Sequence, residues 1–260
     1  MTEQIEAADP AAATGAEMTL MAHLRELRYR LILCLISICV GAAAAFPLSE
    51  LCFKIINSPY YAAFPGQLLI GTGPAEALIL RIKVTFLGGL VLALPVIFFQ
   101  LWRFISPGLQ PNERRLLIPF IGASSALFLA GMWFCYSLIL PVAFSFFADQ
   151  YRIMGLTPAV RIGEHLNMVL TSLLAFGVIF EMPVLAFFLG RIGVIDHRLL
   201  IEWSRYAIVL IFAAAAVLTP PDIVSQLLMA APLLVLYGLS ILLVKHTAVK
   251  SNRRDSDFSS

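Results

Sequence analysis

The sequence predicts an all-helical protein that crosses a membrane six times. Its 260 residues are 60% hydrophobic and only 13% charged, a balance that water-soluble domains of this size do not need. The apolar residues form long continuous runs, whereas strands of a membrane β-barrel alternate over segments of about ten residues. The runs give predicted spans at about 24–46, 76–101, 116–140, 166–190, 204–219 and 223–244, which together form one domain, 19–244.

The two ends of the chain differ from the spans in composition. Residues 1–18 are rich in Ala and acids and contain no Lys or Arg, which predicts a disordered tail. The segment 21–30 then continues without a helix breaker into an apolar run, so one helix is expected to start at the membrane surface and enter the bilayer. Pro47 ends this span. Residues 245–260 form a second polar tail.

Charged side chains in the first helix form a local pattern. Glu26 and Arg30 stand four residues apart, so they can pair on one helix face. The simplest interpretation of this segment is a basic anchor that fixes topology, but such an anchor does not require Glu26 or His23.

Two long connections lie on one side of the predicted membrane. Residues 47–74 are rich in Pro, Gly and Tyr, and we expect a packed cap there; residues 141–164 are predicted as a second long loop. On the other side, 102–115 is a short hydrophilic connection. The fifth span is short, because its apolar run at 207–218 covers only about 18 Å as a helix.

The fourth span contains a single charge, Glu181. Its position ten residues before Arg191 places the carboxyl about 15 Å from the membrane boundary, where an acid costs about 2.5–3.5 kcal/mol on insertion scales. Pro183 cannot donate to the carbonyl of Ile179, so a kink beside the acid is expected. Glu181 is either neutral structural glue hydrogen-bonded to a neighbouring helix or a functional group that faces a cavity or a partner helix.

The distribution of basic residues predicts the orientation. Thirteen of the 18 Lys and Arg residues lie in the N-terminal flank, the connections after the second and fourth spans, and the C-terminal tail. The other five lie on the opposite side. Because basic residues concentrate on the cytoplasmic side, both termini are expected in the cytoplasm.

Four segments resemble the TatC family, the polytopic subunit of the twin-arginine protein translocase. They are HLRELRYR (23–30), FISPGLQPNERR (104–115), FGVIFEMPV (176–184) and LTPPDIVSQLL (218–228), and the match extends from about Met18 to Val244. The resemblance implies six spans in a concave, glove-like bundle in the bacterial cytoplasmic (inner) membrane. It also implies export of folded proteins that carry a twin-arginine signal peptide, driven by the proton-motive force. Implied partners are these signal peptides, single-span TatA- and TatB-type subunits, other copies of the chain and membrane lipid.

The resemblance also implies roles for individual residues. Glu26, Arg28 and Glu113 match positions that bind the signal peptide, and Glu181 matches the intramembrane acid of the fourth span. The supporting motif positions, where architecture is expected more than contact, are His23, Arg30, Pro59, Phe104, Pro107, Gly108, Asp222 and Gln226. Without the resemblance, Glu26 is most simply explained by its pair with Arg30, and Glu113 by helix capping.

Two other functions compete with that of a translocase. A proton-coupled small-molecule transporter explains Glu181 as a proton carrier but not the acids and aromatic residues expected in the cytoplasm. An intramembrane enzyme lacks support, because the sequence has no HExxH or GxSxG motif. The four cysteines show no metal-binding spacing, and no cofactor or metal is expected. The net charge of +2 gives no indication of nucleic-acid binding.

Overall fold

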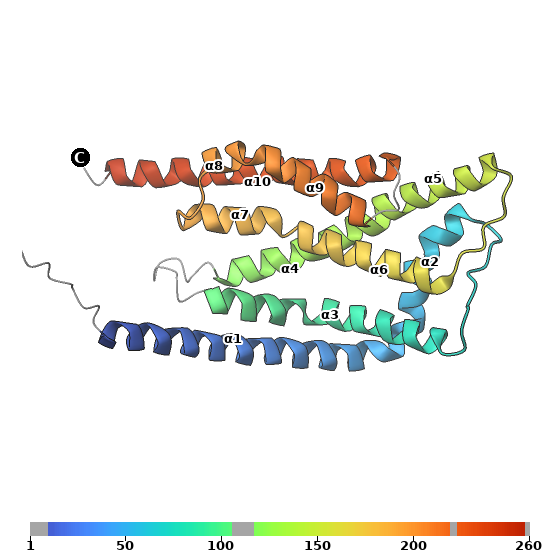
Figure 1. Ribbon diagram of the computed structural model, residues 1–260, viewed down its shortest axis with the longest axis horizontal. Helices are drawn as coiled ribbons and strands as arrows, with labels where there is room; N and C mark the ends of the chain where they lie inside the picture. The colour runs from blue at the N-terminus through green and yellow to red at the C-terminus, as the bar shows by residue number, and fades with distance from the viewer. Residues whose placement is uncertain (1–9, 106–116, 219–222, 258–260) are drawn as a thin grey trace, which may run out of the picture.

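A computed structural model describes residues 10–105, 117–218 and 223–257, and this part of the chain is helical (Figure 1). The helices are α1 (Pro10–Ala45), α2 (Ser49–Ala63), α3 (Glu76–Ile105), α4 (Leu117–Phe134), α5 (Leu140–Ile153), α6 (Ile162–Ile179), α7 (Met182–Arg191), α8 (His197–Glu202), α9 (Ser204–Leu218) and α10 (Ile223–Asp257). Among the described residues, β pairing is limited to one isolated bridge between Ile70 and Arg161.

The bundle has two distinct ends (Figure 1). One end, called here the termini end, carries the start of α1, the end of α3, the start of α4 and the end of α10. The opposite end, called the cap end, carries α2 and α5, which pack against each other. The start of α1 and the end of α10 therefore lie on the same side of the bundle.

Four helical stretches are long and apolar enough to cross a membrane. They are Met21–Ala63, Glu76–Ile105, Ile118–Ile153 and Ile162–Arg191. Two shorter apolar helices follow, Ser204–Ala216 and Met229–Lys245. Helix α9 has 15 residues and is about 22 Å long, shorter than the hydrocarbon core of about 30 Å.

Helices α1 and α10 extend beyond the predicted spans. The continuous α1 confirms that one helix includes both the charged segment and the first apolar run, and it ends at Ala45 before Pro47. It begins at Pro10, within the segment where composition predicted disorder, because an Ala-rich sequence readily continues a helix that has already formed. Helix α10 similarly continues to Asp257, into the predicted polar tail.

Small residues allow the backbones of α1 and α3 to come into direct contact. A Cβ atom added to Gly89 of α3 would lie 2.4 Å from the backbone nitrogen of Ala42 on α1. A Cβ atom on Gly41 would lie 2.5 Å from the carbonyl oxygen of Gly89. Small residues at such crossings bring membrane helices into close van der Waals contact, so this contact fixes how α1 sits on α3.

The two long connections at the cap end contain helices, which corrects the prediction that they are loops. Helix α2 occupies much of 47–74, and α5 occupies 140–153. The chain passes Pro141 through a π-helical turn at Cys135–Ile139, in which the amide of Leu140 donates to the carbonyl of Cys135. This wider turn accommodates the residue that cannot donate a hydrogen bond. The prediction of a packed cap is confirmed, but the cap is largely helical.

The predicted kink beside Glu181 is confirmed. Helix α6 ends at Ile179 and α7 begins at Met182, with Pro183 in the first turn of α7. The helical pattern resumes when the amide of Leu185 donates to the carbonyl of Glu181 over 2.9 Å. The break thus places Glu181 at the start of a new helix rather than in the middle of an old one.

Candidate functional site

A polar cluster joins α1 to α3 at the termini end. The Nε atom of Arg30 donates to Oε1 of Glu26 over 3.0 Å, and its Nη2 atom contacts the same oxygen. The Nη1 atom of Arg30 reaches Oε1 of Gln100 over 3.4 Å. The Arg30 side chain is only 13% exposed, whereas that of Glu26 is 34% exposed. The predicted pair therefore exists, and its carboxylate is the member that solvent can reach.

An aromatic contact adjoins this cluster. The ring of His23 stacks on Phe104, with centroids 4.4 Å apart and ring planes 22° apart. Two predicted motif positions from different helices therefore meet, and they connect α1 to α3 one turn before Glu26. Arg28 lies on the exposed surface of α1.

The remaining predicted positions are not brought together at one place. Pro59 is buried within α2 at the cap end. The side-chain amide of Gln226 donates to the carbonyl of Phe212 over 3.0 Å, which ties the start of α10 to α9. Glu113, Pro107, Gly108 and Asp222 lie outside the described residues.

Glu181 is buried between helices, with an exposure of 7%. The side chain of Ser124 on α4 lies near the carboxyl. Oε1 of Glu181 is buried and has no hydrogen-bond partner in the described part of the chain. A buried polar atom without a partner is uncommon and costly, so the carboxyl keeps one position open for a donor.

Two residues around Glu181 were not identified from the sequence. The indole Nε1 of Trp102 donates to Oγ of Ser124 over 3.2 Å, and both side chains are almost completely buried. A serine within an apolar run could have indicated a buried polar contact, but Ser124 and its neighbour Ser125 give the same indication. Only the fold shows which of the two hydroxyls contacts the indole of Trp102.

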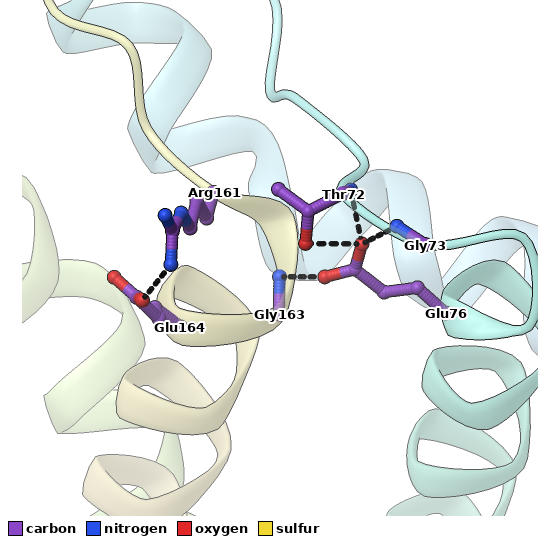
Figure 2. A network of polar contacts seen from close by, with 6 residues as sticks. All are labelled: Thr72, Gly73, Glu76, Arg161, Gly163 and Glu164. Carbon is purple, nitrogen blue, oxygen red and sulfur yellow. Dashed lines mark hydrogen bonds and ion pairs between the residues drawn. The ribbon is translucent and has the colours of Figure 1, made fainter.

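A second acid, Glu76, accepts hydrogen bonds from two connections at the cap end (Figure 2). The sequence did not predict it as a site residue. Its Oε2 atom accepts from the amide of Thr72 over 2.5 Å, from the Thr72 hydroxyl over 3.2 Å and from the amide of Gly73 over 3.2 Å. Its Oε1 atom accepts from the amide of Gly163 at the start of α6 over 3.1 Å. We call these residues the Glu76 clasp.

The Glu76 clasp joins the two connections of the cap. It lies beside the bridge in which Ile70 pairs with the backbone at 160–162. A Cβ atom on Gly163 would lie 2.5 Å from Oε1 of Glu76, so the bond depends on glycine at that position. Arg161 and Glu164 form an exposed ion pair, with Nη1 and Oε1 3.3 Å apart, and this pair lies beside the clasp (Figure 2).

The arrangement suits binding rather than bond-making chemistry. The termini end presents a carboxylate that already accepts a guanidinium, next to stacked rings. In the described residues, no group of three or more His, Cys, Asp or Glu side chains could hold a metal ion.

Comparison with known proteins places the chain in a family. The model of the family described as Sec-independent protein translocase protein (TatC) matches residues 22–232. The TatC protein of Campylobacter jejuni is 39% identical over 237 residues, covering 90% of this chain and 97% of that protein. That of Aquifex aeolicus is 39% identical over 229 residues, covering 88% and 95%.

Solved structures agree with the sequence comparison. A crystal structure of the twin arginine translocase receptor TatC superposes with a TM-score of 0.79 at 38% identity, covering 87% of this chain and 99% of that one. A second, in the detergent DDM, gives 0.80 at 39% identity, covering 86% and 99%. None of these similarities favours a small-molecule transporter. The chain therefore belongs to the TatC family and is a multi-pass membrane subunit of the twin-arginine protein translocase.

Proposed function

We propose that the termini end of this subunit recognises the paired arginines of a signal peptide. Glu26 and Glu113 take the two guanidinium groups, and Arg28 contacts other polar groups of the peptide. Glu113 enters this proposal through the family resemblance, because it belongs to the segment that joins α3 to α4. The end of α3 and the start of α4 lie at the termini end (Figure 1), and Arg30 joins Glu26 to Gln100 near the end of α3.

The observation that carries the proposal is the pair of Glu26 and Arg30. The Arg30 guanidinium already bonds to the Glu26 carboxylate. Another nitrogen of the same guanidinium donates to Gln100. The site therefore has the chemistry that an incoming arginine requires, and the more exposed partner is the acid. We infer that Arg30 holds Glu26 in place when no signal peptide is bound.

The geometry of arginine explains why lysine is a poor substitute. A guanidinium is planar, permanently charged and able to form two parallel hydrogen bonds to a carboxylate. The lysine ammonium is a compact point charge that cannot form this fork. A site built on carboxylates consequently discriminates between the two cations although their charge is equal.

Peptide binding to purified variants tests the proposal. Glu26→Ala and Glu113→Ala should each weaken binding of an Arg-Arg signal peptide roughly 10- to 150-fold in Kd, because a charged hydrogen bond is lost. Glu164→Ala is the matched control, since that acid is exposed at the cap end. Wild-type affinity in both termini-end variants would contradict the proposal.

We further propose six spans with both termini in the cytoplasm of a bacterial inner membrane. Support comes from the four long apolar stretches, the two shorter apolar helices, the shared end of α1 and α10, and the excess of basic residues at that end. A membrane-impermeant thiol reagent should label Cys52 but not a single cysteine introduced at Ser256 in intact cells. Labelling at Ser256 would reverse the orientation. The concave shape stays a prediction of the resemblance.

Glu181 is proposed to contact a partner during transport driven by the proton-motive force. Its buried Oε1 atom has no hydrogen-bond partner among the described residues, and a helix of a single-span TatA- or TatB-type subunit, or of another copy of this chain, would reach it only where the surrounding helices separate. A polar group on such a helix would satisfy an acceptor or donor that is otherwise costly in an apolar surrounding. The translocase complex would thereby supply a bond that the described residues of this chain do not make.

A further inference from the structure

A lysine of α3 and an asparagine of α6 meet on the exposed surface of the bundle. The Nζ atom of Lys83 donates to Oδ1 of Asn167 over 2.7 Å, and both residues are exposed. An ammonium cannot accept a hydrogen bond, so the amide oxygen must be the atom that faces it. The pair therefore carries a net positive charge, and its other N–H groups, on Nζ of Lys83 and on the amide of Asn167, are donors.

The positive charge of Lys83 is not neutralised within the described part of the chain. Lys83 forms no ion pair there with an acid. The acids nearest along the two helices are Glu76, two turns before Lys83, and Glu164, one turn before Asn167. Glu76 accepts from the amides of the Glu76 clasp, and Glu164 pairs with Arg161. The lysine can therefore bind an anion from outside the chain.

The position of Lys83 along α3 coincides with a membrane boundary. Residues 84–102 contain no charged side chain, and Arg103 stands 20 residues after Lys83. At 1.5 Å per residue this separation is about 30 Å, the thickness of the hydrocarbon core. With Arg103 at one boundary, Lys83 lies at the other, where the headgroups of the leaflet at the cap end begin.

The surface around the pair is suited to lipid. Ile79 and Phe86, one turn to either side of Lys83 on α3, are 50% and 47% exposed. On α6, Thr171 is exposed one turn after Asn167. Apolar side chains exposed on a membrane span face acyl chains, and a long lysine side chain extends from such a surface toward the headgroups. The abundant anion at this depth is the phosphate of a phospholipid.

We propose that Lys83 and Asn167 form a binding site for the phosphate of a phospholipid in the leaflet at the cap end. The ammonium and the amide NH2 group donate to the phosphate oxygens, and an acyl chain lies along the exposed surface at Phe86. Because the two side chains come from different helices, the bound lipid joins α3 to α6 on the membrane side of the Glu76 clasp.

Native mass spectrometry of the full-length protein in detergent tests the proposal. The protein is titrated with phosphatidylglycerol or with diacylglycerol of the same acyl chains. Wild type should bind the first phosphatidylglycerol about tenfold more tightly, because only this lipid carries the phosphate. Lys83→Gln should remove most of this preference. Asn167→Asp should remove it as well, because a carboxylate placed where Oδ1 lies would pair with the ammonium instead of the phosphate.

The matched control is Arg152→Gln, because Arg152 is an exposed cation at the end of α5 and should leave the preference unchanged. Asn167→Asp keeps a contact between α3 and α6, so its thermal midpoint without lipid should not fall, and it decides the question alone if Lys83→Gln fails to fold. Inorganic phosphate should not displace the lipid, since it has no acyl chains; displacement would identify free phosphate as the ligand.

Three results would overturn the proposal. Wild type could bind both lipids equally, or the preference could persist in Lys83→Gln and Asn167→Asp. A third contrary result is a preference that persists in Lys83→Gln while transport is lost, which would identify the anion at Lys83 as an acid of another protein.

Discussion

Two acids at helix starts, Glu76 and Glu181, show two uses of a carboxylate in one membrane protein. Glu76 begins α3, and its oxygens accept from four groups of the chain, including an amide at the start of α6 (Figure 2). Glu181 stands at the N-cap of α7, yet its side chain makes no capping bond there. A helix N-terminus attracts negative charge, so the missing cap bond at Glu181 is the informative difference.

The contrast indicates which acid stabilises the fold. All the bonds of Glu76 close within the chain, so its removal exposes several donors at once. The buried Oε1 atom of Glu181 has no partner among the described residues, so removal of this acid leaves few groups unpaired. We therefore expect stability to depend on Glu76 and transport to depend on Glu181.

The largest expected effect is on transport in Glu181→Leu. Transport into vesicles should fall by at least about tenfold if one hydrogen bond to a partner is lost. Thermal stability in detergent should stay the same or rise, because an acid that costs about 2.5–3.5 kcal/mol on insertion scales is removed. Glu181→Gln keeps hydrogen-bonding groups and should be milder. Transport at the wild-type rate in Glu181→Leu would remove the functional interpretation of this acid.

The next effect is on stability in Glu76→Ala. Glu76→Ala removes the acceptor of four hydrogen bonds, but the freed loop amides can turn to water, so we expect a moderate loss of stability. The thermal midpoint in detergent measures this loss. Glu164→Ala is the control, because its pair with Arg161 is exposed on both sides and should contribute little. Equal midpoints for the two variants would show that the clasp does not hold the cap.

A smaller loss is expected in Gly163→Ala. The added Cβ would lie 2.5 Å from Oε1 of Glu76, so this one bond breaks while those to Thr72 and Gly73 persist. We expect the thermal midpoint to fall by about half as much as in Glu76→Ala. Because both changes act on one bond, the double variant should be less destabilised than the two losses added together. If the two losses of stability simply add in the double variant, Gly163→Ala acts through something other than the Glu76 clasp.

The smallest effect concerns Asp196, which caps α8. Its Oδ1 atom accepts from both the amide and the ring Nδ1 of His197 at 2.6 Å, and the His197 side chain holds the pKa of Asp196 below its ordinary value of 3.8. A lowered pKa means that the charged form stabilises the fold above pH 3.8 and that this contribution disappears as the pH falls through the folded pKa. Asp196→Asn should be slightly less stable than wild type near neutral pH, and the gap should close in acid. A gap that widens in acid would contradict this sign.

Local features of the fold were predictable, because they depend on neighbours in sequence. The pair of Glu26 and Arg30 follows from a spacing of four residues, and the break at Glu181 follows from a proline that cannot donate. The helices of the cap were missed because Pro59 and the surrounding Gly and Tyr residues are typical of loops. The packing of α2 against α5 outweighs that local preference.

Long-range contacts could not be predicted in the same way. The bond between Glu76 and Gly163 joins residues 87 positions apart. Trp102 and Ser124 are 22 positions apart on different helices, and the sequence does not distinguish Ser124 from Ser125. Such contacts are set by how helices pack, so they became visible only in the folded chain.

Glu26 is a third acid, paired but still accessible, and its proposed role is to recognise the signal peptide. The most direct test is the ratio of affinities for Arg-Arg and Lys-Lys signal peptides, measured with wild type and with the Glu26→Ala/Glu113→Ala double variant. Wild type should prefer Arg-Arg, because only a guanidinium forms the bidentate pair, and the double variant should bind both peptides with equal weakness. A double variant that keeps the wild-type preference would place recognition elsewhere on the protein.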